Sequence, residues 1–361
     1  MCFYYRIMKT NIQCTITVNS FQCFDVRLNN MSLERKHKLW INYVIGPLLF
    51  IILSFSIYYK VKNQAGLQET KDLLKGAVAG NNAWLLLFLV LLMSINWGIE
   101  AAKWYVLVKR VQPVSYFTAY KAVLSGVSLS LFVPNGIGDY AGRLVYMQEG
   151  NRLKSVTLTL VGSMAQLIIT LTCGFCGLIY LSQYVWPNAI QFEGLSVFWV
   201  NGIIFMTGMG ALLMLFIYFK LNWLTIMFEK IPFVHKYRFM VENLETISRT
   251  DLTRILSLSL VRYIVFIVQY IIMLHIFNVQ LNTADAISTI AVLFLVLAIL
   301  PTIPVADLGM RGEAGLQLFG LLTLNKLGII ATTAGIWLIN LILPAMAGSL
   351  FILGIKLFRN R

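Results

Sequence analysis

Charged residues are scarce in this chain, and their scarcity excludes a soluble globular protein. Of the 361 residues, 12% are charged and 58% are hydrophobic, against roughly 25% charged in a soluble domain. The mean hydropathy is +0.76. The composition therefore indicates a polytopic membrane protein, and we expect an all-α fold because a helix pairs its own backbone groups in lipid.

Residues that bind metals are also few. The chain has 3 histidines, which are scattered, and 5 cysteines. Cys173 and Cys176 form a C-x-x-C pair, but no second pair completes a zinc site, so we expect no metal and no other cofactor. The sequences G-x-S-x-G, H-E-x-x-H and Walker A do not occur, so we do not expect an enzyme.

Acidic residues are outnumbered by basic ones, 15 to 29, which gives a net charge of +14. The lysines and arginines cluster at the ends of apolar stretches, where they orient helices and meet anionic headgroups. No basic stripe is interleaved with aromatic residues. We therefore expect the partner to be a membrane lipid and expect no binding of nucleic acid.

Long apolar runs are abundant. A membrane-spanning helix needs about 20 apolar residues, and several stretches reach that length. These stretches are 40–59, 83–107, 155–183, 196–219, 253–277 and 329–357. Two shorter stretches, 115–133 and 284–303, run directly into breaks rich in proline, glycine and charge.

The first break reads P-N-G-I-G-D-Y-A-G-R from Pro134 to Arg143, and the second reads P-T-I-P-V-A-D-L-G-M-R-G-E from Pro301 to Glu313. Unpaired backbone groups and ionised side chains are costly in lipid. Such sequences are expected to line a protein-enclosed site inside the bilayer.

The distribution of basic residues tests how many stretches cross the membrane. Segment 220–254 is rich in lysine and arginine, whereas loops 184–195 and 278–283 contain neither. The first should be cytoplasmic and the other two outside, and both basic termini should be cytoplasmic. Eight full crossings would place these loops on the wrong sides.

Two re-entrant hairpins remove this conflict. Residues 115–150 would enter from the cytoplasm and turn at Pro134 to Gly138. Residues 284–327 would enter from the opposite side and turn at Pro304 to Gly309. The simpler alternative is eight full transmembrane spans with both breaks as ordinary loops.

The hairpins divide the predicted transmembrane domain, residues 39–357, into an inverted repeat of two four-element halves. The halves are 40–183 and 196–357, and a cytoplasmic linker at 221–252 joins them. Many secondary transporters share this plan. We expect residues 1–38 to form an N-terminal extension that is disordered or that precedes the true start at Met31.

The breaks also carry the chemistry of an anion site. Arg143 and Arg311 offer planar forks suited to phosphate, and half-helix N-termini add N–H groups. We expect both arginines to approach one cavity near the bilayer midplane. Asp139, Asp307 and Glu313 would hold the arginines or carry a coupling proton, although Asp139 and Arg143 could equally form a structural i, i+4 pair.

Glycine and proline residues complete the predicted hairpins. Gly138 and Gly309 let the backbone adopt positive φ and let other groups approach closely. Pro134 and Pro304 end the incoming half-helices and provide hinges. The same glycine role is expected for Gly136, Gly142, Gly312 and Gly315.

A further polar motif, N-W-x-x-E-A-x-K-W, covers residues 96–104. Glu100 and Lys103 lie one turn apart and can pair, and the two tryptophans suit headgroup level. We interpret this motif as an interfacial anchor, with a ligand site as the alternative. Arg262 lies within an apolar stretch and should face a partner or a cavity, unless it snorkels to the cytoplasmic surface.

Both breaks and the N-W-x-x-E-A-x-K-W motif together resemble the flippase-like transmembrane family, which includes the membrane region of lysylphosphatidylglycerol synthases. The resemblance covers about residues 40–357. It implies a multi-pass protein of the bacterial inner membrane that translocates an anionic phospholipid or a polyprenyl-phosphate-linked lipid.

Full synthases of that family add a cytosolic aminoacyl-transfer domain. These residues do not include such a domain, so we do not expect synthesis of lysylphosphatidylglycerol. The alternative function is a non-transporting membrane partner of a separate lipid or glycan enzyme.

Overall fold

A computed structural model describes residues 55, 83–131, 136–186, 197–221, 244, 247–300 and 307–353. All of these residues belong to one unit, Leu49–Ile355. They contain helices and no β-strand, which confirms the all-α prediction. The predicted N-terminal extension and the stretch at 40–59, apart from residue 55, lie outside the described residues.

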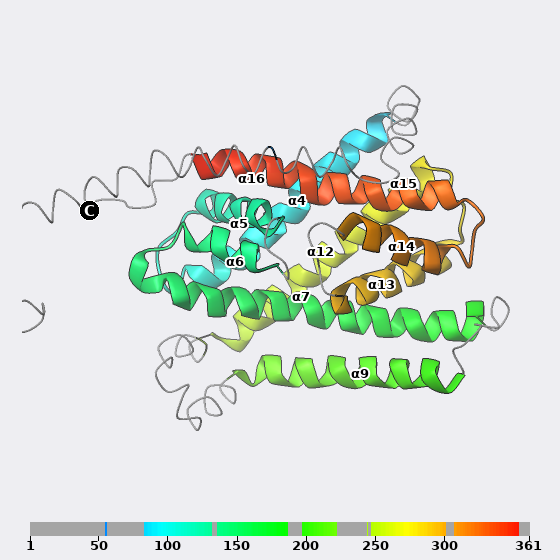
Figure 1. The fold of residues 1–361 in the computed structure, drawn as a ribbon. Helices are drawn as coiled ribbons and strands as arrows, with labels where there is room; N and C mark the ends of the chain where they lie inside the picture. The colour runs from blue at the N-terminus through cyan, green and yellow to red at the C-terminus, as the bar shows by residue number, and fades with distance from the viewer. Residues whose placement is uncertain are drawn as a thin grey trace, which may run out of the picture. The chain divides into compact units, whose positions relative to one another are not determined.

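The helices follow one another in the order shown in Figure 1. They are α4 (Ala83–Val108), α5 (Tyr116–Ser130), α6 (Ile137–Leu144), the 3₁₀ turn η3 (Glu149–Asn151), α7 (Arg152–Tyr180), the π-helical turn η4 (Leu181–Val185), α9 (Val197–Phe219), α12 (Arg249–Ile276), α13 (Thr283–Ile299), α14 (Asp307–Phe319), α15 (Lys326–Trp337), the π-helical turn η6 (Leu338–Ile342) and α16 (Leu343–Leu353).

Five helical segments are long and apolar enough to cross a membrane. They are Ala83–Val108, Glu149–Val185, Phe198–Phe219, Arg249–Ile276 and Lys326–Ile352. Each coincides with one of the predicted apolar stretches. The chain is therefore a multi-pass membrane protein.

The helices that flank the two breaks are shorter. α5 and α6 have 15 and 8 residues, or roughly 22 and 12 Å at 1.5 Å per residue. α13 and α14 have 17 and 13 residues, or roughly 26 and 20 Å. Each is shorter than a hydrocarbon core of about 30 Å. α5 packs against α6, and α13 packs against α14.

The turns of both breaks fall largely outside the described residues, and Pro134 and Pro304 lie there. Among the described residues of these turns is Gly136, the N-cap of α6, which has φ +70°. This is the left-handed region that glycine adopts without a Cβ penalty. The predicted role of glycine in the first turn is thus confirmed at Gly136.

Small residues also bring α5 and α6 into close contact. A Cβ at Gly138 would overlap the backbone of Leu129, and a Cβ at Gly142 would overlap the backbone of Gly126. The predicted close approach is therefore confirmed for Gly138 and Gly142. It lets the short α6 lie directly on α5.

The same prediction is wrong for Gly309 and Gly312 in the second break. Neither glycine has a positive φ, and a Cβ at either position would meet no atom within 4 Å. Gly315 differs, because a Cβ there would lie 2.7 Å from the Thr333 side chain. The helix α14 thus needs a glycine only where it crosses α15.

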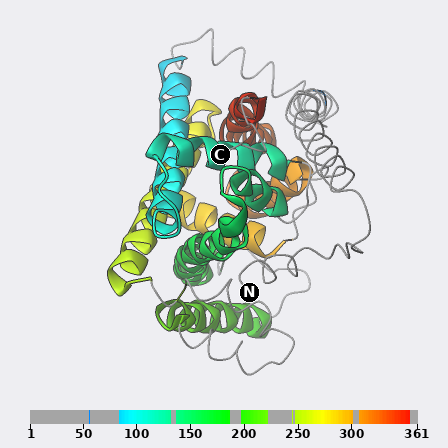
Figure 2. The ribbon, with the colours of Figure 1, turned by 90° about the vertical axis from the view of Figure 1, so that its left-hand side faces the viewer.

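The helices α4, α7 and α12 form the frame that positions the polar residues described below. α12 packs on both α4 and α7, while α9 lies along α7 (Figure 1, Figure 2). An ion pair between Arg110 and Asp251 joins the C-terminal end of α4 to the first turn of α12. Ser248 caps that turn by accepting a hydrogen bond from the backbone N–H of Asp251.

Candidate functional site

A cluster of ionised side chains lies buried among α4, α6 and α12. We call it the central charge cluster. It consists of Glu100 and Lys103 on α4, Asp139 and Arg143 on α6, and Arg262 on α12. Arg262 thus meets residues of α4 that lie more than 160 positions earlier in the chain. The sequence had predicted contacts only between close neighbours, Glu100 with Lys103 and Asp139 with Arg143.

Glu100 is the centre of this cluster. Its Oε1 accepts a hydrogen bond from Arg143 Nη2 at 3.0 Å. Its Oε2 lies 3.0 Å from Lys103 Nζ and 3.1 Å from Arg262 Nη1. One carboxylate therefore joins three cations from three helices.

Arg143 also forms a two-point contact with Asp139 within α6. Nε donates to Oδ1 at 3.1 Å, and Nη2 donates to Oδ2 at 2.7 Å. The predicted i, i+4 pair is confirmed. The Arg143 side chain is buried, but the Asp139 side chain is 27% exposed, so Asp139 is the member that a ligand could replace most readily.

Arg262 faces a partner inside the protein, which was the first of the two predictions for this residue. Its Nε donates to Asn96 Oδ1 at 2.7 Å, and its guanidinium lies 5.0 Å from the centre of the Trp97 ring. The side chain is only 12% exposed. The alternative, that Arg262 snorkels to the surface, is therefore wrong.

The formal charges of the central charge cluster do not balance, since three cations face two carboxylates. Each of the three cations contacts at least one of these carboxylates. The cluster therefore carries an excess of one formal positive charge. The fork of Arg143 matches a carboxylate or phosphate in geometry.

The interpretation of residues 96–104 as an interfacial anchor is wrong. Trp97 and Trp104 are buried at 9% and 1% exposure, so their rings pack inside the protein and do not anchor it by facing lipid headgroups. Trp97 Nε1 donates to the backbone oxygen of Asn340, and Trp104 Nε1 donates to Thr159 Oγ1, both at 3.2 Å. The motif fastens α4 to η6 and α7, and its polar residues build the cluster.

The second break forms a separate group, which we call the second charge cluster: Asp307, Arg311 and Trp337. Arg311 Nε donates to Asp307 Oδ1 at 3.0 Å, and Trp337 Nε1 donates to Asp307 Oδ2 at 3.0 Å. The pair repeats the i, i+4 spacing of Asp139 and Arg143. Asp307 and Trp337 are buried, whereas Arg311 is half-buried.

Glu313 does not join the second charge cluster. It is exposed on α14, and its Oε1 accepts a hydrogen bond from Gln317 Nε2 at 2.8 Å. Two residues along a helix correspond to a rotation of about 200°, which turns Glu313 away from Arg311. Gly309 is also exposed and lies outside the contacts of this cluster.

Among the described residues, the carboxylates that accept hydrogen bonds from Arg143 are Glu100 and Asp139, whereas Arg311 donates to Asp307, so the two arginines share no acceptor. Their two clusters connect through intermediate residues: Trp337 of the second cluster leads directly into η6, where the Asn340 backbone binds Trp97 beneath Arg262. A cavity shared by both arginines stays a prediction.

Sequence reasoning missed the roles of Trp337 and Asn340. The available signal was the indole N–H of Trp337 inside an apolar stretch, because a buried tryptophan usually finds an acceptor. Asn340 gave a weaker signal, since its contact uses the backbone. Within the described ranges, no three His, Cys, Asp or Glu side chains are grouped so that they could hold a metal ion.

Long apolar helices that enclose ion pairs define a polytopic α-helical membrane protein. The chain belongs to the family described as Lysylphosphatidylglycerol synthase TM region, whose family model matches residues 41–351. The match includes both charge clusters and confirms the resemblance inferred from the motifs. Neither the curated proteins nor the solved structures give a significant match.

Proposed function

We propose that this protein is a lipid flippase or transporter whose substrate carries an anionic or lipid-linked phosphate headgroup. The observation that carries the proposal is the excess positive charge of the central charge cluster, buried among α4, α6 and α12. Ionisable groups inside a membrane protein commonly mark a substrate or ion pathway. A phosphate would balance this excess positive charge.

The contact between Arg143 and Asp139 suggests how the headgroup binds. Asp139 occupies both N–H groups on one edge of the guanidinium, which is the edge that a phosphate would use. A headgroup that displaces the partly exposed Asp139 carboxylate keeps both hydrogen bonds of Arg143. Glu100 meanwhile holds Arg143 in position by accepting a hydrogen bond from Nη2.

The second charge cluster is proposed to bind the headgroup at another stage of its passage. Asp307 and Arg311 repeat the spacing and the paired geometry of Asp139 and Arg143. Arg311 is more exposed than Arg143. Asp139 and Asp307 would then gate the two arginines or carry a coupling proton.

The membrane arrangement that we propose is the inverted repeat with two re-entrant hairpins. The shortness of α5, α6, α13 and α14 supports it, because none of them alone matches the bilayer core. Eight full spans would require α5 to cross with 15 residues. We place both termini in the cytoplasm and the protein in the bacterial inner membrane.

A translocation assay tests the proposed function. The purified protein is reconstituted in vesicles with a fluorescent anionic phospholipid, and dithionite quenching reports how fast the lipid changes leaflet. Arg143→Ala and Arg311→Ala should each slow translocation at least about tenfold, since losing one partner of a buried charge pair costs roughly 2–5 kcal/mol. Arg254→Ala, at an exposed position on α12, is the matched control.

Wild-type rates in both Arg143→Ala and Arg311→Ala would contradict the transport mechanism. If a separate lipid or glycan enzyme then co-purified and depended on this protein for activity, the alternative of a non-transporting membrane partner would be favoured. No enzymatic step is part of the proposal.

A further inference from the structure

Lys103 is the most buried cation of the central charge cluster and the one with the fewest partners. Its side chain is 1% exposed, against 5% for Arg143 and 12% for Arg262. Among the described residues, its ammonium group has one acceptor, Glu100 Oε2 at 3.0 Å. An ammonium group has three N–H donors, and a buried donor without an acceptor is destabilising. Protonated Lys103 therefore has fewer acceptors in this part of the chain than it has donors.

The two arginines of the cluster are better supplied with partners. Arg143 donates to two carboxylates, those of Glu100 and Asp139. Arg262 contacts Glu100 and also donates to Asn96 Oδ1 at 2.7 Å. A guanidinium group keeps its proton at every pH at which proteins are folded. Both arginines are thus permanent cations with several partners.

Lys103 and Arg262 share a single oxygen atom of Glu100. Lys103 Nζ lies 3.0 Å from Oε2, and Arg262 Nη1 lies 3.1 Å from the same atom. The two cationic nitrogens are therefore close to each other, and like charges repel strongly in a medium of low dielectric. Arginine cannot relieve this repulsion by losing a proton, whereas a buried lysine can.

The charge count of the cluster leads to the same residue. Three of its members can exchange a proton, and they are Glu100, Asp139 and Lys103. Protonation of either carboxylate would raise the excess from one positive charge to two. Loss of the proton from Lys103 would instead leave two arginines facing two carboxylates, which balance. Release of this proton is the one exchange that neutralises the cluster.

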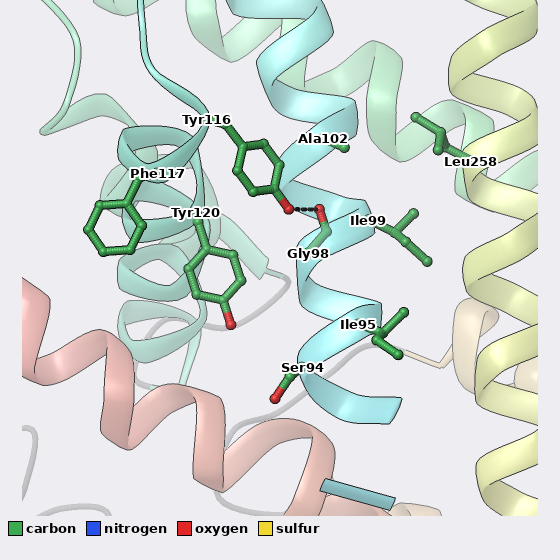
Figure 3. A pocket seen from close by; sticks show the side chains of 9 residues that line it. All are labelled: Ser94, Ile95, Gly98, Ile99, Ala102, Tyr116, Phe117, Tyr120 and Leu258. Carbon is green, nitrogen blue, oxygen red and sulfur yellow. Dashed lines mark hydrogen bonds between the residues drawn. The ribbon is translucent and has the colours of Figure 1, made fainter. Parts of the chain in front are cut away.

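The remaining helices that pack on α4 in the described part of the chain are α5, α7 and η6. None of them forms an ion pair or a hydrogen bond with Lys103 there. Tyr116 and Tyr120 of α5 lie beside Gly98 (Figure 3), which is about 140° around the helix from Lys103. α7 contacts α4 through the neutral side chain of Thr159, and η6 contains no titratable residue. The charged groups around Lys103 are thus those of the cluster itself.

We propose that Lys103 is a proton-binding site, whose ammonium group releases its proton at neutral pH and regains it when an anion binds beside Arg143. On release, an N–H bond breaks, the nitrogen keeps the electron pair and the proton passes to water. The excess positive charge of the cluster is present while Lys103 holds the proton. Uptake of the proton together with an anion rests on the proposed function, whereas release of the proton by Lys103 does not.

Unfolding at different pH tests the proton site without an added ligand. The full chain in detergent is unfolded with denaturant across the range of about pH 7–9, in which an unfolded lysine keeps its proton. The unfolded state then binds one proton more than the folded state, so stability rises with pH. The unfolding equilibrium constant should fall by up to about tenfold per pH unit. A lysine that is charged in both states contributes no such slope.

Two variants isolate the contribution of Lys103 to this slope. Lys103→Met has no ionisable group and Lys103→Arg has a permanent charge, so both should lack it. Lys326→Met, at the exposed first residue of α15, is the matched control and should retain it. The same pH dependence in the wild type and in either Lys103 variant would overturn the proton site. Should neither variant fold, a wild-type stability that does not rise over this range would overturn it.

Calorimetry tests the uptake of the proton with an anion. Short-chain phosphatidylglycerol is added to the full chain in two buffers of different ionisation enthalpy, at about pH 8, where an ordinary lysine holds its proton. The phosphodiester stays singly charged at this pH, so the difference in heat counts protons that the protein takes up. The wild type should take up close to one proton per lipid bound, and Lys103→Arg should bind the lipid and take up none.

Two outcomes of the calorimetry would overturn the coupling. Binding to the wild type without proton uptake would show that Lys103 does not respond to the anion. Equal uptake by the wild type and by Lys103→Arg would assign the proton to another group. If phosphatidylglycerol does not bind, the proposed headgroup class fails and the coupling fails with it.

The pH dependence of unfolding separates this inference from the proposed function. Normal translocation in Arg143→Ala and Arg311→Ala, together with a slope that Lys103→Met removes, would reject the transport mechanism and retain the proton site. Translocation that depends on both arginines, together with a slope that Lys103→Met retains, would support transport and reject Lys103 as the proton site.

Discussion

Glu100 is the residue on which the central charge cluster depends. Its two oxygens contact Lys103, Arg143 and Arg262. Buried like charges repel strongly in a medium of low dielectric, so these three cations can lie together only around a carboxylate. Asp139 provides a second carboxylate, which pairs with Arg143.

Replacing Glu100 should therefore destabilise the fold. Glu100→Gln keeps the size of the side chain but removes its charge, and it leaves three buried cations facing a single carboxylate. We expect a loss of roughly 3 kcal/mol in the free energy of unfolding, measured by thermal or denaturant unfolding in detergent. Glu149→Gln, at an exposed position in η3, should change stability by less than about 0.5 kcal/mol.

An unchanged stability of Glu100→Gln would mean that the cations are compensated by groups other than Glu100. That result would also weaken the case for an anion site at this cluster. Stabilisation of the variant by added anionic lipid would support the site instead.

The sequence identified most residues of the two charge clusters, but it predicted fewer of the contacts between helices. It identified the pairs Asp139–Arg143 and Glu100–Lys103, because helical spacing alone brings such neighbours together. It could not show that both pairs meet Arg262, since helix packing determines that contact. It also included Glu313, because spacing in the sequence does not reveal which face of α14 is buried.

At the scale of elements, glycines determine how α5 and α6 associate. Gly126 and Gly142 face each other without side chains between the helix backbones, and Gly138 approaches Leu129. This contact lets an eight-residue helix, α6, carry Asp139 and Arg143. A helix this short is not stable by itself in water and depends on packing.

A single methyl group at Gly142 should disturb that contact. The Cβ of Gly142→Ala would overlap the backbone of Gly126, so α6 would have to move. We expect a loss of roughly 1–3 kcal/mol in stability together with slower translocation, because Arg143 lies one residue further on. Unfolding in detergent and the dithionite assay measure the two effects.

Gly150→Ala is the matched control for this change. A Cβ at Gly150 would meet no atom within 4 Å, so stability should stay within about 0.5 kcal/mol of wild type. Equal stability of Gly142→Ala and Gly150→Ala would show that the close helix contact does not support α6.

Most helix positions could be predicted from the length of the apolar runs, and the five long segments begin and end within a few residues of the predicted stretches. The roles of individual glycines were harder to predict. Glycine permits a left-handed turn, a close contact or neither, and only the packing around Gly136, Gly142 and Gly309 separates these cases.

At the scale of the whole molecule, the central proposal is that the two halves, residues 40–183 and 196–357, have opposite orientations in the membrane. The proposed membrane topology rests on the distribution of basic residues, which is a statistical rule, and on the shortness of α5, α6, α13 and α14. The inverted repeat would place the two charge clusters on elements of opposite orientation. This arrangement is how many transporters expose one site to alternate sides.

Accessibility of single cysteines tests the topology. With the native cysteines replaced, cysteines at positions 188 and 282 should react with a membrane-impermeant thiol reagent added from outside. A cysteine at Thr250, exposed in the first turn of α12, should react only from the cytoplasm. Labelling of Asn188→Cys or Asn282→Cys only from the cytoplasm would contradict the hairpins.

The π-helical turn η6 has a mechanical consequence for the two clusters. Trp337 precedes the turn and binds Asp307, while Asn340 within the turn binds Trp97. A π-turn contains one residue more than an α-helical turn, and one residue corresponds to about 100° of rotation. If η6 relaxed to a regular α-helix, it would rotate one of these contacts relative to the other, so the two arginine sites cannot be repositioned independently through this helix.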